Sequence, residues 1–125
     1  MSQRVSGYER KERDLYETPE WVTEALVRDL GGRKFSRVWE PATGSGKMWN
    51  ILQTNWTCQG TDIVTGYDFL MMERVCGEPV ADDIDAIISN PPYELATEFV
   101  EHALKLMEPV DGLVAMLLRT DFDHA

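Results

Sequence analysis

The chain has 125 residues, of which 22 are acidic and 12 are basic, and its formal net charge is −10. This length suits one small domain with a core of its own, and the charge argues against a large nucleic-acid surface within the chain. The chain lacks both an apolar run long enough for a transmembrane helix and the N-terminal apolar stretch of a signal peptide. A membrane protein is therefore not expected.

The charge is unevenly distributed along the chain. Residues 1–47 carry nine Lys/Arg and eight Asp/Glu, whereas residues 48–125 carry three and fourteen, so a basic, sequence-reading part is expected elsewhere. Residues 1–14 alternate in charge and contain few apolar side chains, which predicts a flexible N-terminal arm. Residues 15–125 are predicted to form one domain.

Neither the cysteines nor the clustered aspartates indicate a metal site. Cys58 and Cys76 lack metal-ligand spacing, and without a secretory signal they are predicted to be reduced thiols in a cytoplasmic protein. Asp82, Asp83 and Asp85 are joined by no His or Cys and do not follow the calcium-loop pattern. We therefore predict that the protein holds no metal.

The first predicted helix begins at the Thr-Pro pair. Thr18 suits the N-cap position and Pro19 the first helical position, while Gly31 provides a stop. Between them, four residues at helical spacing form one apolar face: Val22, Ala25, Leu26 and Leu30.

A short β-prone stretch over residues 37–40 precedes a glycine-rich loop. Gly44 and Gly46 follow it, and a helix is predicted over residues 47–54. A strand, a Gly-x-Gly loop and a helix are the layout of a Rossmann-type loop, in which the glycines let the backbone approach a ligand. No Gly-Lys-Ser/Thr follows, which argues against a phosphate-binding loop.

A second strand is predicted over residues 59–63, with Asp62 at its tip. Asp62 lies 22 residues after Glu40, near the spacing at which nucleotide-binding folds place a carboxylate for ribose hydroxyls. A short helix is predicted over residues 70–76, just after Asp68 and Phe69.

The most informative stretch is the buried apolar strand that ends at Asn90-Pro91-Pro92-Tyr93. Two prolines stop the ladder, because neither has a backbone N–H, and they make a stiff corner at the carboxyl end of a strand. The Asn90 side-chain carbonyl and the Pro91 backbone carbonyl can accept both hydrogens of an exocyclic –NH2 group, and Tyr93 can stack on its ring. The alternative is a plain strand-end turn with a core tyrosine.

After this corner, residues 94–107 have the spacing of an amphipathic helix, and residues 113–118 that of another buried strand. His102 is predicted to be a surface or boundary residue. The alternation of strands and helices predicts an α/β fold with a mostly parallel, doubly wound sheet.

The motifs together resemble those of S-adenosylmethionine-dependent DNA adenine-N6 methyltransferases, and are similar to those of small phage and prophage enzymes. Asn90-Pro91-Pro92-Tyr93 resembles the family's catalytic motif, and Glu40-Pro41-Ala42-Thr43-Gly44-Ser45-Gly46 matches its Glu-Pro-x-x-Gly-x-Gly form. The resemblance implies the Rossmann-like class I methyltransferase fold from about residue 16 onward. The last two strands of that fold and a C-terminal target-recognition region are missing, so the chain resembles a truncated enzyme.

The resemblance also implies roles for individual residues. Tyr16 and Thr18 would contact the methionine end of the cofactor, although capping is an alternative for Thr18. Asp68 would accept from the cofactor's adenine amino group and Phe69 would stack on its ring, whereas the alternative places Phe69 in the core and Asp68 as a turn cap. The implied cofactor-binding residues are Tyr16, Thr18, Glu40, Pro41, Thr43, Gly44, Gly46, Asp62, Ile63, Asp68, Phe69 and Asn90. The implied catalytic residues are Asn90, Pro91, Pro92 and Tyr93.

The function implied by the resemblance is methyl transfer from S-adenosylmethionine to the N6 amino group of adenine in DNA. DNA would be bound through the missing C-terminal region. Other planar amines remain as alternatives, namely cytosine N4, guanine N2 in RNA or a glutamine side chain. A further alternative is a cofactor-binding fragment that has no activity by itself.

Overall fold

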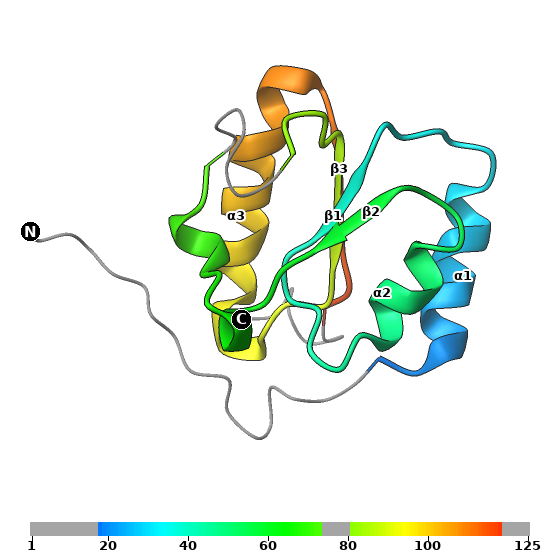
Figure 1. Cartoon of the computed structure of the whole chain (residues 1–125), viewed down its shortest axis with the longest axis horizontal. Coiled ribbons are helices and arrows are strands. Elements are labelled where there is room, and N and C mark those ends of the chain that lie inside the picture. The colour runs from blue at the N-terminus through cyan, green and yellow to red at the C-terminus, as the bar shows by residue number, and fades with distance from the viewer. Residues whose placement is uncertain (1–17, 74–80, 119–125) are drawn as a thin grey trace, which may run out of the picture.

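The computed structural model describes residues 18–73 and 81–118 of the chain. The arm predicted over residues 1–14, Tyr16 and Cys76 lie outside the described residues. Within them, four strands form one all-parallel sheet in the order β2-β1-β3-β4 (Figure 1). The strands are β1 (Val38–Glu40), β2 (Cys58–Gly60), β3 (Ala86–Ser89) and β4 (Leu113–Met116). The predicted α/β fold with a parallel sheet is confirmed.

Helices cover both faces of this sheet (Figure 1). Helices α1 (Glu20–Leu30) and α2 (Lys47–Leu52) lie on one face, and α3 (Ala96–Met107) lies on the other. Successive side chains of a strand point to opposite faces, so Val38 packs with the α1–α2 side while Trp39 packs with the α3 side. Strands covered on both faces need continuous apolar runs, as in β3, where all four residues are buried.

The strand order fixes where a ligand can approach. From β1 the chain passes through α2 to β2 on one side, whereas β3 pairs with the other side of β1. The direction of winding therefore reverses between β1 and β3. In open parallel sheets, the carboxyl ends of the strands at such a reversal form a crevice that serves as the ligand site.

Several local predictions need correction. Pro19, rather than Thr18, is the N-cap of α1, and its side chain makes no capping hydrogen bond. Helix α2 ends at Leu52 instead of residue 54, and β2 ends before Asp62, which lies just past the strand. The stop at Gly31 is confirmed, since its φ is 44° and its N–H donates to the Val27 carbonyl.

The helix predicted over residues 70–76 is wrong where the structure describes it. A single 3-10 turn, Phe69–Met71, takes its place, and Met72 is already extended. The Asp68 carboxylate accepts from the Leu70 N–H at 3.1 Å and starts this turn. Residues 74–76 lie outside the described residues.

Two of the aspartates before β3 hold the beginnings of strands together. The Asp85 carboxylate accepts from the backbone N–H groups of Ser36 and Arg37, at 2.9 and 3.2 Å. Asp83 pairs with the Arg37 guanidinium at 2.7 Å, and this hydrogen bond keeps the pKa of Asp83 below its ordinary value. No helix among the described residues is long and apolar enough to cross a membrane.

Candidate active site

The tips of three adjacent strands carry most of the residues that the sequence indicated. Glu40 ends β1, Asp62 lies two residues beyond β2, and Asn90 directly follows β3. Because β1 lies between β2 and β3 and all strands are parallel, these three positions share one edge of the sheet. In Figure 1 this edge faces downward, where α2 and α3 begin.

Glu40 links the two central strands. Its carboxylate is 1% exposed, and its Oε2 atom accepts from the Ser89 hydroxyl at 2.9 Å and from the Ala42 N–H at 3.1 Å. The Ser89 hydroxyl therefore ties the end of β3 to the end of β1. Ser89 is not among the residues predicted for the site, although it is the one polar residue of β3 and stands at the strand's end.

Asp62 holds the glycine loop in place. Its Oδ2 atom accepts from the Gly44 N–H at 2.7 Å and its Oδ1 atom from the Val64 N–H at 2.9 Å. Gly44 and Gly46 have φ values of 55° and 93°, in the left-handed region that favours glycine. Asp62 is 3% exposed, so in this structure its first role is to hold the loop against the tip of β2.

Trp49 and Thr43 lie against the last residue of β2. A Cβ atom on Gly60 would come within 2.6 Å of Thr43 Cγ2 and 2.8 Å of Trp49 Cδ1, so only glycine leaves them this space. Sequence reasoning had no local signal for Gly60 or Trp49, since the contact depends on how α2 packs on β2. Ile63, at the start of the next turn, is half-buried.

Phe69 is a core residue in this structure. Its side chain is fully buried, and its ring meets Trp39 and His102 edge-on, with centroid distances of 5.1 and 4.9 Å. Phe99 packs against it at 4.9 Å. No face of the Phe69 ring is open for stacking, and Asp68 caps the turn, so the geometry corresponds to the alternative considered for both residues. His102 is half-buried, as predicted for a boundary residue.

The Asn-Pro-Pro-Tyr corner is joined to the start of α1. Asn90 Nδ2 donates to the Thr18 hydroxyl at 2.8 Å, across 72 positions of sequence. Pro91 and Pro92 are buried, whereas Asn90 and Tyr93 are half-buried. The Leu95 N–H donates to the Pro92 carbonyl at 3.1 Å, so the turn Tyr93–Leu95 uses that carbonyl.

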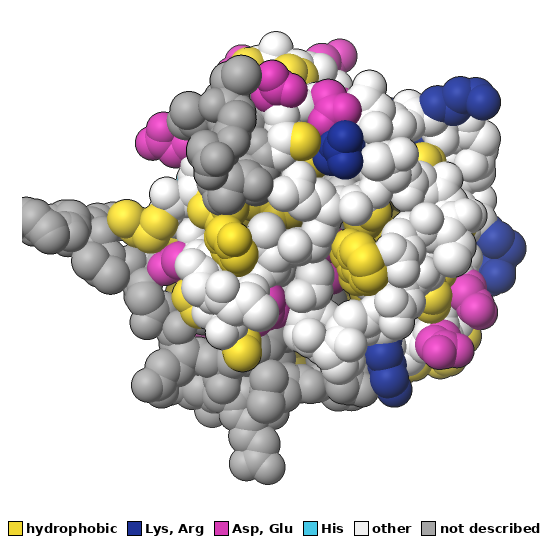
Figure 2. Space-filling view, viewed as in Figure 1, with side chains coloured by type: hydrophobic (Ala, Val, Ile, Leu, Met, Phe, Trp, Pro, Cys, Tyr) yellow, Lys and Arg dark blue, Asp and Glu magenta, His cyan; other side chains and the backbone are white. Residues whose placement is uncertain are grey.

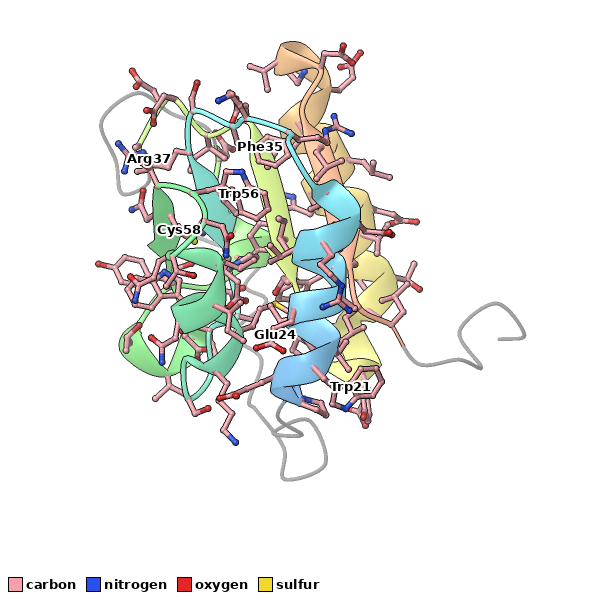
Figure 3. The ribbon with its side chains drawn as sticks, turned by 90° about the vertical axis from the view of Figure 1, so that its right-hand side faces the viewer. Trp21, Glu24, Phe35, Arg37, Trp56 and Cys58 are labelled. Atoms are coloured by element: carbon pink, nitrogen blue, oxygen red, sulfur yellow. The ribbon has the colours of Figure 1, made fainter. Side chains whose placement is uncertain are left out.

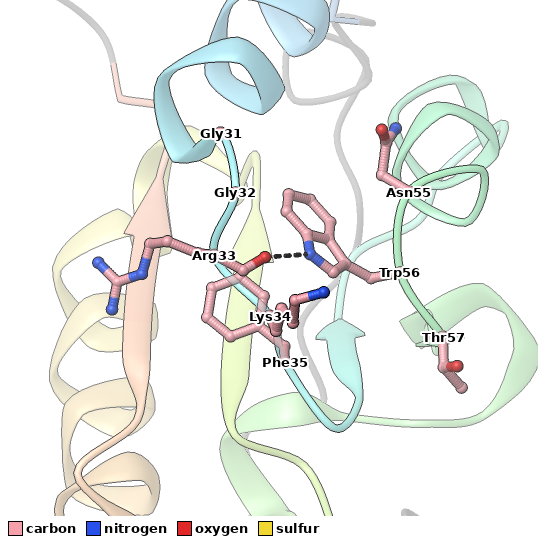
Figure 4. A pocket seen from close by; sticks show the side chains of 8 residues that line it. All are labelled: Gly31, Gly32, Arg33, Lys34, Phe35, Asn55, Trp56 and Thr57. Atoms are coloured by element: carbon pink, nitrogen blue, oxygen red, sulfur yellow. Dashed lines mark hydrogen bonds between the residues drawn. The ribbon is translucent and has the colours of Figure 1, made fainter.

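A groove of about 460 Å³ lies at the other end of the sheet. The segments 31–35 and 55–57 line it, and they precede β1 and β2 (Figure 4). Trp56 Nε1 donates to the Arg33 carbonyl at 3.0 Å, and the Phe35 and Trp56 rings lie 5.3 Å apart. In Figure 3 Phe35 and Trp56 lie at one end of the molecule and Trp21, near the start of α1, at the other. The groove is therefore remote from the strand tips.

Comparison with protein-family models, curated proteins and solved structures gave no match to this chain. The chemistry must therefore be inferred from the strand-tip site alone. The contacts there are pairwise: Asn90 bonds to Thr18, Asp62 to Gly44, and Glu40 to Ser89 and Ala42, while Thr43 lies against Gly60.

Proposed function

We propose that this chain transfers a methyl group from S-adenosylmethionine to a planar exocyclic amine, with the N6 amino group of adenine in DNA as the preferred acceptor. The observation that carries the proposal is the position of the Asn90 amide. It follows a fully buried strand at the winding reversal of a parallel sheet, and the preceding residue, Ser89, bonds to Glu40 at the start of the glycine loop. Open α/β sheets bind their ligands at such a point.

The residues at the strand tips have the chemistry that the cofactor needs. S-adenosylmethionine carries a sulfonium, an ammonium, a carboxylate and ribose hydroxyls. A site for it needs carboxylates that accept from the ammonium and the hydroxyls, and a backbone that can approach the cofactor closely. Glu40 supplies a buried carboxylate and Asp62 a second one, while Gly44 and Gly46 leave the loop without side chains. For the adenine ring of the cofactor, Phe69 offers no stacking surface in this structure, because its side chain is fully buried.

The bound cofactor supplies a methyl group activated by its positive sulfur. The chain's own contribution is to position the acceptor amine and stabilise the charge that develops on it. The Asn90 and Pro91 carbonyl oxygens accept from the two amine hydrogens, which makes the nitrogen lone pair more available for in-line attack. As the new N–C bond forms, the bond between the methyl group and sulfur would break, and its electron pair would remain on sulfur to leave neutral S-adenosylhomocysteine. The nitrogen would then carry a positive charge next to two oxygen dipoles until one proton leaves to solvent.

Binding of the cofactor without turnover is the second candidate function, and the surface charge favours it. The net charge is −10, and on the face that Figure 2 shows the Lys and Arg side chains of the described residues lie singly and form no basic stripe. DNA binding depends on such stripes because each phosphate contact needs a nearby cation. A chain that binds the cofactor tightly but methylates no amine would fit this candidate.

The experiment combines a binding and a transfer measurement on the 125-residue chain. Calorimetric titration with S-adenosylhomocysteine tests cofactor binding. Transfer of labelled methyl to single-stranded and duplex oligonucleotides, followed by nucleoside mass analysis, tests the reaction. Parallel assays with RNA and a glutamine peptide distinguish the other planar amines.

Variants at the corner decide whether it is catalytic. We expect Asn90→Ala to lower transfer by about 100-fold or more while the affinity for S-adenosylhomocysteine changes little, because the interaction is made mainly in the transition state. Tyr93→Ala should impair use of the acceptor base and Tyr93→Phe much less, because stacking requires only the ring. Asn50→Ala, at an exposed asparagine of α2, is the matched control. Wild-type transfer by Asn90→Ala would disprove the catalytic role of the corner.

A further inference from the structure

We infer that Thr18 is a positioning residue whose hydroxyl holds the Asn90 amide in the plane required for catalysis, an inference that rests on the proposed function. The two residues are 72 positions apart, yet Asn90 Nδ2 lies 2.8 Å from Thr18 Oγ1. Thr18 is 5% exposed, so water has little access to compete for this bond.

The local backbone makes the Thr18 hydroxyl available for this contact. A residue before proline is restricted to extended conformations, which limits the backbone freedom of Thr18. Helix α1 begins with the Val22 N–H donating to the Pro19 carbonyl at 3.0 Å, and the N-cap residue is Pro19, whose side chain makes no capping hydrogen bond. The hydroxyl is therefore not used at the helix N-terminus, where the sequence pattern had placed it, and it faces the end of β3 instead.

The chemical need for such a partner follows from the shape of an amide. Asn90 can rotate about its last side-chain bond, and this rotation moves its single acceptor oxygen relative to the incoming amine. A hydrogen bond from Nδ2 to Thr18 fixes the amide plane and directs the carbonyl oxygen away from Thr18. The acceptor is then held in place before the amine arrives, which is the positioning on which the reaction depends.

This role differs measurably from direct contact with the methionine end of the cofactor. A positioning residue affects the rate of transfer and leaves cofactor affinity almost unchanged. A cofactor ligand affects the affinity first. As a positioning residue, Thr18 would influence the transfer rate although it lies far from the catalytic motif in sequence.

The experiment compares Thr18→Val, which removes the hydroxyl at equal volume, with Thr18→Ser, which keeps it. We expect Thr18→Val to lower kcat by about 10- to 100-fold, because small misplacements of reacting groups have effects of this size. KM and the Kd for S-adenosylhomocysteine should change less than about threefold. Thr18→Ser should restore most of the rate.

Thr23→Val is the matched control, because Thr23 is a buried threonine on α1 whose hydroxyl has no hydrogen-bond partner among the described residues. Its kcat should equal that of the wild type. The NMR signals of the Asn90 side-chain amide, assigned by their loss in Asn90→Ala, should move in Thr18→Val and stay in place in Thr18→Ser and Thr23→Val.

The possible failures are distinguishable. If the wild type transfers methyl groups and Thr18→Val does so equally fast, the positioning role is refuted while the proposed function stands. A raised Kd with unchanged kcat would make Thr18 a cofactor ligand instead. If the wild type methylates none of the amines, the proposed function fails and the positioning role fails with it.

Discussion

Replacing Asp62 by alanine should release the glycine loop from the tip of β2. The carboxylate accepts two backbone hydrogen bonds, from Gly44 at 2.7 Å and from Val64 at 2.9 Å, while it is 3% exposed. Hydrogen bonds to a charged group contribute about 1.5–3 kcal/mol each, and the freed N–H groups of these two residues can reach water. We therefore expect each hydrogen bond to contribute about 1.5 kcal/mol, the lower limit of this range, so that Asp62→Ala lowers the free energy of unfolding by about 3 kcal/mol.

Asp62→Asn should cost about half as much. Its amide retains one acceptor oxygen, but it presents an –NH2 group to the other backbone donor. Because the loop it holds belongs to the proposed cofactor site, Asp62→Ala should also weaken S-adenosylhomocysteine binding by about 1–3 kcal/mol. The Asn variant should be intermediate in both properties.

Urea unfolding followed by tryptophan fluorescence measures the first effect, and calorimetric titration the second. Asp29→Ala is the control for loss of a negative charge, since Asp29 is exposed on α1, and it should stay within about 0.5 kcal/mol of the wild type. If Asp62→Ala is as stable as this control, Asp62 does not hold the loop. Unchanged affinity for S-adenosylhomocysteine would remove it from the cofactor site.

Thr23→Val should raise the free energy of unfolding by about 1 kcal/mol in a urea titration, because the buried Thr23 hydroxyl has no partner among the described residues; a loss of stability would contradict this. Gly112→Ala should lower the free energy of unfolding by about 1–3 kcal/mol, since a Cβ there would lie 2.6 Å from Met107 Sδ and 2.8 Å from the Asp85 carbonyl oxygen. An unchanged melting temperature would refute this close contact. Burial, with the nearby Glu40 carboxylate, raises the pKa of Cys58 to about 12. Thiol-reagent modification of Cys58 near pH 8, followed by peptide mass analysis, should therefore be roughly a thousandfold slower in the folded protein than in urea. Since the unfolded thiol ionises first, Cys58 should also make stability fall as pH rises from about 9 toward 12, and Cys58→Ala should reduce that slope.

The sequence by itself determined the architecture. The uninterrupted apolar residues of β3 require cover on both faces, and the alternation of such strands with helices implies a parallel sheet. Gly31 ends its helix and the two prolines end β3 for reasons contained in the residues themselves, a left-handed backbone and a missing N–H. Because these signals are local, the approximate positions of the strand tips could be predicted, although β2 ends before the predicted residue.

Only the tertiary structure decided which partner each polar side chain found. Thr18 has the local features of an N-cap, yet its hydroxyl bonds to Asn90, and Glu40 bonds to Ser89 on a different strand. Likewise, the motif around Phe69 is compatible with stacking on a ligand or with core packing. The packing of α3 on the sheet decides in favour of the core.

The physical reason is the range of the interactions. Helix stops, strand breaks and burial periodicity depend on residues a few positions apart, so they can be read along the chain. A hydrogen bond across 72 positions, or a buried ring packed between Trp39 of β1 and Phe99 of α3, exists only after folding has brought distant segments together. Short turns such as Phe69–Met71 gain little from local propensity, and packing therefore determines their form.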